Sequence, residues 1–428
     1  MALGWLWSAV ALASPVAYVG ATLHPVDAPN VEDGVLLVDG STIQAVGSRA
    51  AVAVPADAKV VDLTGKHLMP GLVDTHSHVG GGQYNDALAP IQPALSAIDT
   101  IDVSHDSLKR VRAGGVTTAN VMPGSGKLMG GQTAYIKLRD ARVVDDLLMC
   151  IPRQEPLPAP VDGPLRRREI CGGMKMANGT NPQGGGGDPR SRMGAAYLQR
   201  AALTRGVEAV EAGVSATADL EALGLSEVVT GQRTVHFHTH RGDDIVTILA
   251  LRREFGIDVV LHHVSEAWKV VDALAADPVP CSLIVVDAPG GKEEAQQLAL
   301  HNGAMLEAAG VPVAFHTDDP ITDSRLFLRS AGLAVRAGMS PEAALAALTL
   351  VPARMMHLEH RIGSLTPGKD ADFVVLSGPP LSVWTHVDQT FVEGVPVFDR
   401  ATAEGERLAT GGAPEVSSPD ILHDHRGD

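Results

Sequence analysis

Apolar runs alternate with helical stretches through the middle of the chain, and this alternation limits the fold more than any other feature of the sequence. Apolar runs of this length predict strands. The expected strands are His67–Val73, Val116–Val121, Thr234–His238, Asp258–His263, Ser282–Asp287 and Val311–His316. The expected helices are Asp243–Phe255, Glu293–Ala309, Arg325–Ala337 and Pro341–Met356. Repeated strand–helix units of this kind predict an α/β fold with a parallel sheet, either open or closed into a (β/α)8 TIM barrel.

Both ends of the chain carry a different pattern, in which short strand-like pieces are separated by Gly and Asp-Gly turns. This pattern is typical of a small antiparallel β unit. We therefore expect one small sheet domain built from residues 15–65 and 366–400, around a central domain of residues 66–365. Residues 401–428 are rich in Gly, Pro and Asp without an apolar period, which predicts a mobile tail.

Composition excludes several classes of protein. Hydrophobic residues make up 45% of the 428 residues, which is enough for a large core, so a wholly disordered chain is excluded. The formal net charge is −16, which repels phosphate backbones and argues against nucleic acid as a partner. The three cysteines, at positions 150, 171 and 281, are too few for a disulfide framework and have no CxxC spacing.

The first residues leave the location of the protein open between the cytoplasm and export. Residues 1–14 are uncharged, and Ala11-Leu12-Ala13 has the small residues of a signal-peptide cleavage site. A basic segment before the apolar run, which signal peptides carry, is missing. The alternative is a simple lead-in to a first strand at Pro15–Leu23. A membrane span is the weakest interpretation, because Ala, Gly, Ser and Pro dilute the apolar run.

Histidines and aspartates gather at the ends of the predicted strands. His76 and His78 follow the first apolar run, and residues two apart in a strand point to the same side, so both can bind one ion. Three further strand ends carry His236, His238 and His240; His262 and His263; and His316, Asp318 and Asp319. Buried imidazole and carboxylate groups are costly unless they share a ligand. The sequence therefore predicts a metal site at the carboxyl ends of the strands.

Four segments resemble a known family. Residues Gly65–His78 and Gly363–Val375 resemble the opening and closing segments of the amidohydrolase superfamily. Residues Pro123–Gln132 and Gly173–Pro182 resemble its imidazolonepropionase-like branch, and the likeness covers about residues 16–398. The resemblance implies a metal-dependent (β/α)8 TIM barrel with a small composite β-sandwich domain. It also implies hydrolysis, usually of C–N bonds, with one or two divalent metal ions as cofactor, zinc being favoured.

The resemblance also implies a set of metal ligands. The first-strand pair corresponds to His76 and His78, and the fifth-strand histidine corresponds best to His238, with His236 and His240 sharing its side of the strand. The sixth-strand histidine corresponds to His263, in which case His262 is expected to point away. The last-strand aspartate corresponds to Asp318, with Asp319 as the alternative.

A lysine completes this set in the two-metal members, where a carboxylated lysine on the fourth strand bridges the ions. Lys175 is the only lysine between Lys137 and Lys269, and it lies where a short fourth strand is expected. An ordinary surface lysine or a contact to substrate charge is the alternative interpretation. Because single-metal members lack the bridge, the number of ions stays open.

The sequence thus predicts a metal-dependent hydrolase of an amide or cyclic amide. The metal would polarise the carbonyl and lower the pKa of its bound water. Asp318 would take the proton from the attacking hydroxide and pass it to the departing nitrogen. Gln132 and His240 are candidate contacts to the small-molecule substrate, a structural role for Gln132 being the alternative.

Two alternatives remain, a deaminase with the same fold and a non-catalytic binding protein that kept it. The substrate itself is not predicted, because specificity lies in loops such as residues 79–105 and 150–172. No stable membrane span is expected, and a homo-oligomer is left open.

Overall fold

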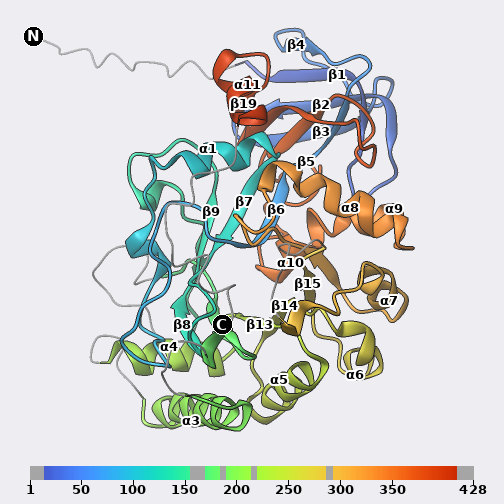
Figure 1. The fold of residues 1–428 in the computed structure, drawn as a ribbon. Coiled ribbons are helices and arrows are strands. Elements are labelled where there is room, and N and C mark those ends of the chain that lie inside the picture. Colours follow the sequence, from blue (N-terminus) through green and yellow to red (C-terminus); the bar gives the residue numbers. More distant parts are fainter. Residues whose placement is uncertain (1–13, 155–168, 184–188, 214–218, 286–292, 412–428) are drawn as a thin grey trace, which may run out of the picture.

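A computed structural model describes residues 14–154, 169–183, 189–213, 219–285 and 293–411 (Figure 1). The possible signal segment, the proline-rich part of the 150–172 loop and the end of the predicted tail lie outside these residues. Figure 1 shows a sheet region at the top, formed by both ends of the chain, above a larger region of strands surrounded by helices.

The upper region is an eight-stranded sheet to which both ends of the chain contribute. Its central pairing joins β5 (His67–Pro70) antiparallel to β17 (Phe373–Leu376). The remaining strands are β1 (Val16–Leu23), β2 (Val31–Asp39), β3 (Thr42–Ser48), β4 (Lys59–Asp62), β18 (Val387–Val392) and β19 (Val395–Asp399). On their buried face the rings of Tyr18, Phe373 and Phe391 pack against one another, with centroids 4.4–5.4 Å apart. These aromatic contacts give the sheet a core of its own.

The expected single strand His67–Val73 is wrong, because the chain changes sheets at Gly71. β5 belongs to the upper sheet, whereas β6 (Leu72–Ser77) pairs with β7 (Val116–Val121) in the lower region. The Gly71 amide donates to the Asp372 carbonyl at 3.0 Å. A Cβ on residue 71 would lie 2.2 Å from Oγ1 of Thr117, so only glycine allows this close approach.

The lower region contains the parallel strands that the sequence predicts. A six-stranded sheet has the order β16-β15-β14-β13-β12-β8, and a three-stranded sheet has the order β6-β7-β9. The pairs from β12 to β16 are parallel. The strands are β8 (Met129–Gln132), β9 (Ala134–Lys137), β12 (Met174–Ala177), β13 (Val235–Thr239), β14 (Val259–His263), β15 (Cys281–Leu283) and β16 (Val313–Phe315). β15 and β16 are shorter than expected, and residues 286–287 of the expected strand lie outside the described residues.

Backbone hydrogen bonds connect the first and last strands of this region. The Asp318 amide donates to the His76 carbonyl at 2.9 Å, and the His78 amide donates to the Asp319 carbonyl at 3.2 Å. The buried carboxylate of Asp74 accepts from the amides of His76 (3.1 Å) and Thr317 (3.2 Å). These contacts bring the segment after β16 alongside β6.

Helices pack around the lower strands (Figure 1). They are α1 (Asp106–Ala113), α3 (Arg192–Glu211), α4 (Leu220–Val229), α5 (Gly242–Phe255), α6 (Val271–Ala276), α7 (Asn302–Ala308), α8 (Phe327–Arg336), α9 (Pro341–Ala346) and α10 (Leu350–Met355). Helix α5 matches its predicted range closely, and α8 follows a short 3-10 turn at Ser324–Leu326. Of the expected helix 293–309, only a 3-10 turn at Glu293–Ala295 and α7 are present.

The expected helix 341–356 is broken into α9 and α10, and the strands explain the break. The Ala347 carbonyl accepts from the Phe315 amide of β16 at 2.8 Å, and the Leu348 carbonyl accepts from the Val73 amide of β6 at 2.9 Å. These carbonyls cannot also serve a continuous helix without being shared between two donors. The break therefore anchors two strand edges that carry candidate site residues.

The predicted mobile tail begins with a helix instead. α11 (Ala403–Thr410) is capped by the Thr402 hydroxyl, which accepts from the Gly405 amide at 3.0 Å. A Cβ on Gly405 would lie 1.8 Å from the Asp399 carbonyl oxygen, so the helix packs tightly against the end of β19. Residues 412–428 lie outside the described residues. The sequence prediction missed this helix because only eight residues of weak apolar pattern form it.

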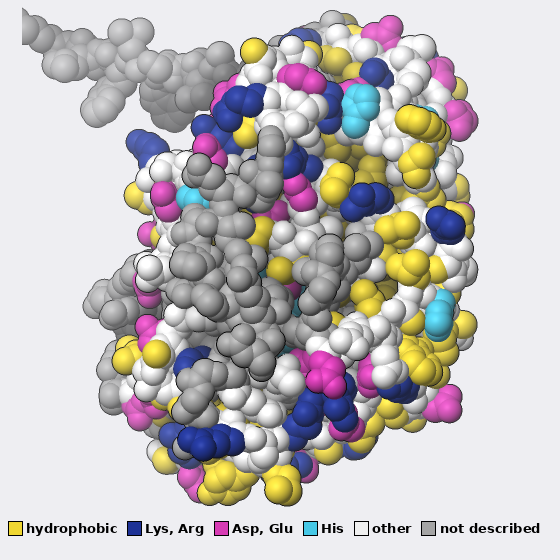
Figure 2. Space-filling model, viewed as in Figure 1, with side chains coloured by type: hydrophobic (Ala, Val, Ile, Leu, Met, Phe, Trp, Pro, Cys, Tyr) yellow, Lys and Arg dark blue, Asp and Glu magenta, His cyan; other side chains and the backbone are white. Residues whose placement is uncertain are grey.

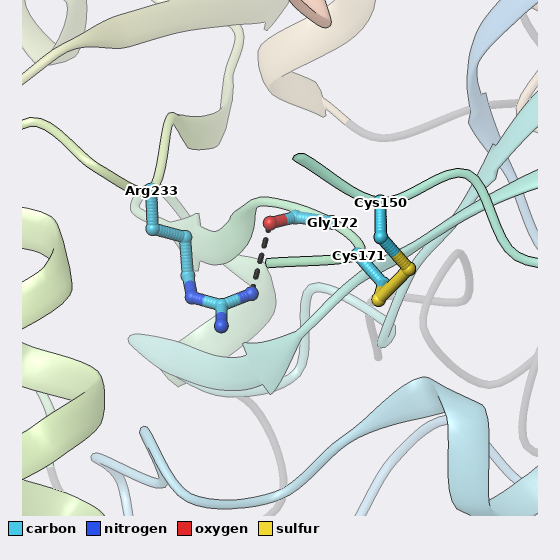
Figure 3. Close-up of a disulfide and its surroundings, with 4 residues drawn as sticks. All are labelled: Cys150, Cys171, Gly172 and Arg233. Carbon is cyan, nitrogen blue, oxygen red and sulfur yellow. Dashed lines mark hydrogen bonds between the residues drawn. A yellow bond between two sulfur atoms is a disulfide. The ribbon is translucent and has the colours of Figure 1, made fainter. Parts of the chain in front are cut away.

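A disulfide joins Cys150 to Cys171, across 21 positions of the chain (Figure 3). The sequence prediction rightly excluded a disulfide framework but missed this single bridge, whose partners have no motif spacing. β10 (Ile151–Pro152) pairs with β11 (Glu169–Ile170) beside it. Arg233 Nη1 donates to the Gly172 carbonyl at 2.8 Å, directly after Cys171 (Figure 3). Both contacts fix the segment that leads into β12.

Surface charge is mixed on the face drawn in Figure 2, where acidic and basic side chains are interspersed. The excess negative charge is therefore not gathered into one patch on that face. Within the described ranges, no helix combines the length and the apolar character that a membrane crossing needs.

Candidate metal centre

Buried histidines, one aspartate and one lysine converge inside the lower region of strands. They come from β6, β12, β13, β14 and the segments that follow β6, β13 and β16. The members are His76, His78, Lys175, His236, His238, His240, His262, His263, His316 and Asp318, and all except the partly exposed His78 are buried. Because charged or polar side chains seldom bury in such number without a shared ligand, the cluster is the candidate functional site.

The first group of possible ligands is His76, His78 and Asp318, whose ligand atoms lie within 4.8 Å of one another. Oδ1 of Asp318 is 3.2 Å from Nε2 of His76 and 3.0 Å from Nε2 of His78. The two histidines thus present the same ring nitrogen to one carboxylate oxygen. This arrangement can hold one divalent cation.

Asp318, rather than Asp319, lies with these histidines. The Asp319 carboxylate instead accepts from Nη2 of Arg110 at 2.8 Å and from the Ser324 hydroxyl at 2.6 Å. Asp318 follows the end of β16 and has a positive φ of 52°, so its side chain is placed by a turn and not by strand alternation. The family resemblance selected Asp318 with Asp319 as the alternative, and in the structure Asp318 is the one beside the two histidines.

The second group is His238, His240 and His263, whose ligand atoms also lie within 4.8 Å of one another. The ring centroids of His238 and His263 are 4.3 Å apart, and Nδ1 of His240 lies 2.8 Å from the Ser265 hydroxyl. Asn181, which the sequence reasoning missed, brings its side-chain amide to 3.4 Å from Nε2 of His238. His240, expected as a substrate contact, therefore lies among the possible ligands of this group.

His262 does not point away from the cluster, and that expectation is wrong. Its ring lies 5.1 Å from the ring of His76, and it forms a third possible ligand group with His76 and His316. The reason is that His263 has a positive φ of 70°. This left-handed turn interrupts the alternation of the strand, so that two consecutive histidines both face the interior.

Lys175 is fully buried on β12, which excludes the interpretation as a surface lysine. Its Nζ lies 3.0 Å from Nε2 of His76 and 3.0 Å from Sδ of Met122. The Lys175 amine, on β12 of the six-stranded sheet, therefore contacts the first group of possible ligands, two of which lie on or directly after β6 of the three-stranded sheet.

Further buried polar side chains contact the histidines of the cluster. Nδ1 of His236 is 2.9 Å from Nε2 of His262, and the Tyr135 hydroxyl is 2.8 Å from Nε2 of His236. On the other side, His316 contacts Ser282 and His263. Of these residues, the sequence singled out His262 and His316 as strand-end histidines and His236 also as an alternative ligand to His238, whereas Tyr135 gave no signal.

Burial lowers the pKa of several histidines of the cluster and so favours their neutral form. Burial, and then the positive charge of Lys175, hold the pKa of His76 well below its usual range. Burial likewise lowers the pKa of His263 far below normal, and lowers that of His316 to about 3. A neutral imidazole offers a lone pair, which is the form that binds metal.

The donor set suits a divalent metal. Nδ1 of His76 and Nε2 of His263 are buried and have no hydrogen-bond partner in the described part of the chain. Neutral imidazole with carboxylate binds zinc well and also suits iron, manganese or nickel. The residues present therefore fit a metal centre of one or two ions without selecting the element.

Gln132 serves the structure with its amide donor. Its Nε2 donates to the Pro93 carbonyl at 3.0 Å, and its backbone pairs with Met174 of β12. In the described residues its side chain makes no hydrogen bond to the histidine cluster. The structural alternative that the sequence left open thus accounts for this donor.

The fold and the site together define a class: an α/β protein of TIM-barrel type with a separate β-sheet region and a centre of buried histidines and aspartate able to bind metal. Comparison with known proteins identifies the same class. A family model described as "Amidohydrolase family" matches residues 191–398. An amidohydrolase structure from Thermotoga maritima is 31% identical, with a TM-score of 0.78, over 90% of this chain and all of that chain.

Two curated relatives extend the comparison. The amidohydrolase tasK of Hapsidospora irregularis is 28% identical over 86% of this chain, which spans only 40% of that relative's length. The imidazolonepropionase of Deinococcus radiodurans is 28% identical over 81% of this chain and 86% of its own length. The chain belongs to the amidohydrolase superfamily, in its imidazolonepropionase-like branch. It is an enzyme that acts on C–N bonds, with hydrolytic activity on amide-type bonds.

Proposed function

We propose that this protein is a metal-dependent hydrolase that cleaves the C–N bond of an amide or a cyclic amide of small size. The observation that carries the proposal is the meeting of His76, His78 and Asp318 within 4.8 Å, beside the group of His238, His240 and His263. In this proposal the strands close into a (β/α)8 barrel. The backbone bonds between β6 and the segment after β16 support that closure.

The proposed ligands are His76, His78 and Asp318 for one ion, and His238 and His263 for a second. All but His78, which is partly exposed, are buried, and the pKa values of His76 and His263 are lowered, so both offer lone pairs at neutral pH. A bound divalent cation, with zinc favoured, supplies Lewis acidity toward a carbonyl oxygen and toward water. The protein contributes the dry, pre-arranged site in which such polarisation is strongest.

Asp318 is the proposed proton carrier. Its carboxylate takes the proton from the water that attacks the carbonyl carbon, and then delivers that proton to the departing nitrogen. The nitrogen leaves as an amine, or stays attached through the opened ring of a cyclic amide. Oδ1 lies 3.0 Å from Nε2 of His78, so the carboxylate is held beside the proposed ligands of the first ion.

Lys175 is proposed to carry a carboxyl group and so to join the two sets of ligands. Its buried Nζ lies 3.0 Å from Nε2 of His76, on a strand that pairs directly with β13, which carries His238. A carbamate is anionic, and a buried anion among neutral imidazoles is stabilised when bound cations compensate its charge. Nuclear magnetic resonance of protein supplied with isotopically labelled bicarbonate tests this point. A carbamate signal that disappears in Lys175→Ala supports it, and its absence from the metal-loaded wild type contradicts it.

His240 and Asn181 are placed at the substrate. Nδ1 of His240 is held by Ser265, and the Asn181 amide is held by Ser125 at 2.6 Å while it faces His238. Both groups therefore border the second set of ligands in fixed orientations. They can hold a substrate carbonyl or amide beside the reacting atoms.

Activity on two kinds of substrate tests the proposed function: a panel of N-acyl amino acids, dipeptides and cyclic amides, and a set of amino-substituted heterocycles for the deaminase alternative. The protein is first stripped with a chelator and then reloaded with zinc, manganese or iron. We expect hydrolysis to disappear with the metal and to return on reloading. Release of ammonia without cleavage of any amide in the panel would instead identify a deaminase, and a metal-loaded protein inert on both substrate types would indicate a binding protein.

A further inference from the structure

His316 contacts His263, one of the proposed ligands of the second ion. Its Nε2 is 3.3 Å from Nδ1 of His263, and the two rings stand nearly perpendicular with centroids 4.7 Å apart. Both side chains are buried, so bulk solvent does not reach this contact. A contact made in such surroundings constrains the orientation of both rings.

A chain of hydrogen bonds continues from the far side of His316. Its Nδ1 is 2.9 Å from the Ser282 hydroxyl, and that hydroxyl is 2.7 Å from the Thr75 hydroxyl. Thr75 precedes His76 on β6, and Ser282 lies on β15. The chain therefore ties His263 to strands on both sides of the cluster.

The positions of the protons follow from one end of this chain. Nε2 of His263 is buried and has no hydrogen-bond partner in the described part of the chain, so it is the nitrogen available to a metal. If that nitrogen carries the lone pair, the proton of the neutral ring sits on Nδ1 and is donated to Nε2 of His316. His316 must then carry its own proton on Nδ1 and donate it to Ser282. One set of tautomers thus satisfies both His–His and His–Ser contacts.

We propose that His316 is a positioning residue that holds His263 in the tautomer and orientation that bind a divalent metal ion through Nε2. This inference rests on the proposed function, because it requires a metal at the second set of ligands. It also excludes His316 itself as a ligand. Both ring nitrogens of His316 are already engaged, Nδ1 with Ser282 and Nε2 with His263, so neither remains for a metal in the third group.

The affinity for zinc tests the proposal, measured by competition with a chromophoric chelator. Removing a group that orients a metal-bound histidine typically weakens binding by about 10- to 100-fold. We expect a loss of that size in His316→Leu, which has no acceptor. His316→Gln, which keeps a side-chain carbonyl near the place of Nε2, should recover most of the affinity. Ser282→Ala removes one oxygen only and should give a smaller loss in the same direction.

A double-mutant cycle separates a positioning residue from a ligand. If His316 acts through His263, adding His316→Leu to His263→Ala should cause little further loss of zinc affinity. Losses that multiply would overturn the proposal, and so would unchanged affinity in His316→Leu. Wild-type protein that binds no zinc at all would overturn the proposed function instead, so the two failures are distinguishable.

The metal-free protein offers a second readout. Nuclear magnetic resonance of nitrogen-labelled histidines reports which ring nitrogen carries the proton. We expect the proton of His263 on Nδ1 in the wild type and a mixture of tautomers in His316→Leu. A proton on Nε2 of His263 in the wild type would contradict the proposal even if the folded state and the metal affinity were normal.

Discussion

At the scale of single residues, the site depends on which side chains the backbone turns toward the cluster. Asp318 and Asp319 are neighbours with the same side chain, yet they have different surroundings. Asp318 faces His76 and His78, whereas Asp319 is paired with Arg110. The two aspartates should therefore answer to the same substitution in different ways.

We predict that Asp318→Asn lowers kcat by about 100-fold or more. The substitution keeps the size of the side chain but removes the carboxylate, which is both the proposed proton carrier and a proposed metal ligand. Asp319→Asn should retain far more activity and should instead lower the melting temperature, since it leaves the guanidinium of Arg110 partly uncompensated. Steady-state kinetics and thermal unfolding of both variants check this. Swapped behaviour would mean that Asp319 is the reacting carboxylate, and full activity in both would contradict the mechanism.

A second prediction at this scale concerns pH and His236. Burial lowers the pKa of His236 to about 3, against the opposite influence of the Asp258 charge, whereas the unfolded chain takes up that proton near pH 6.5. Because the pKa of His236 is lower in the folded state, its contribution to the free energy of unfolding is fully present above about pH 6.5 and is lost as the pH falls below that value. One such histidine costs up to about 2 kcal/mol at pH 5.

Urea unfolding of the metal-free protein between pH 5 and pH 7.5 measures this effect. His236→Gln removes the titrating ring, so its unfolding free energy should depend less on pH than that of the wild type. An equal dependence in both proteins would show that His236 does not carry this part of the acid sensitivity.

At the scale of elements, sequence periodicity predicted the strands and helices best where an element stays within one sheet or forms one unbroken helix. The strand 116–121 has its predicted bounds, and α5 begins one residue early. Prediction failed where the chain passes from one sheet to another, and where backbone groups within an expected helix bond to a strand. Gly71 passes the chain from one sheet to the other, and Ala347 and Leu348 give their carbonyls to strands, so neither break appears in an apolar pattern.

The candidate site shows the same limit. Strand-end spacing pointed to His76, His78, His238, His263 and Asp318 as ligand-type residues, and the family resemblance selected them as a set and added Lys175. The structure brings these side chains into one cluster. The sequence reasoning misplaced His262, because a positive φ at His263 is a property of the turn and leaves no mark in the spacing. It missed Asn181 and Tyr135, since only the packing of distant segments brings them to the cluster.

The disulfide supplies the prediction at this scale. Cys150 and Cys171 close a loop beside the segment that leads into β12, which carries Lys175. The loss of this cross-link should lower the free energy of unfolding by about 3 kcal/mol, as chain entropy predicts for a loop of this length. The variant Cys150→Ala/Cys171→Ala, measured by urea unfolding, gives the size of the effect.

A reducing agent provides the control for this measurement. It should destabilise the wild type by a similar amount and leave the double variant unchanged, because Cys281 is buried and unpaired in both. A wild type insensitive to reduction would mean that the bridge contributes little.

At the scale of the whole molecule, the upper and lower regions differ in the side chains that they bury. The upper sheet has an aromatic core and joins both ends of the chain, while the lower strands bury an unusual number of polar side chains. The cost of burying these imidazoles without a ligand is high, so a bound metal should stabilise the whole fold by mass action. The central claim is therefore that the histidine cluster is a metal centre and not a polar core.

Metal content of purified protein tests that claim most directly, and the chain offers a matched control. His76→Ala/His78→Ala removes the proposed pair of ligands, whereas His24→Ala/His67→Ala removes another contacting pair, 2.9 Å apart, in the upper sheet. Elemental analysis should find one or two divalent ions per chain in the wild type and in the control. The His76/His78 variant should lose at least one ion and its activity while circular dichroism shows a folded protein. Full occupancy in that variant, or a metal-free and active wild type, would contradict the account.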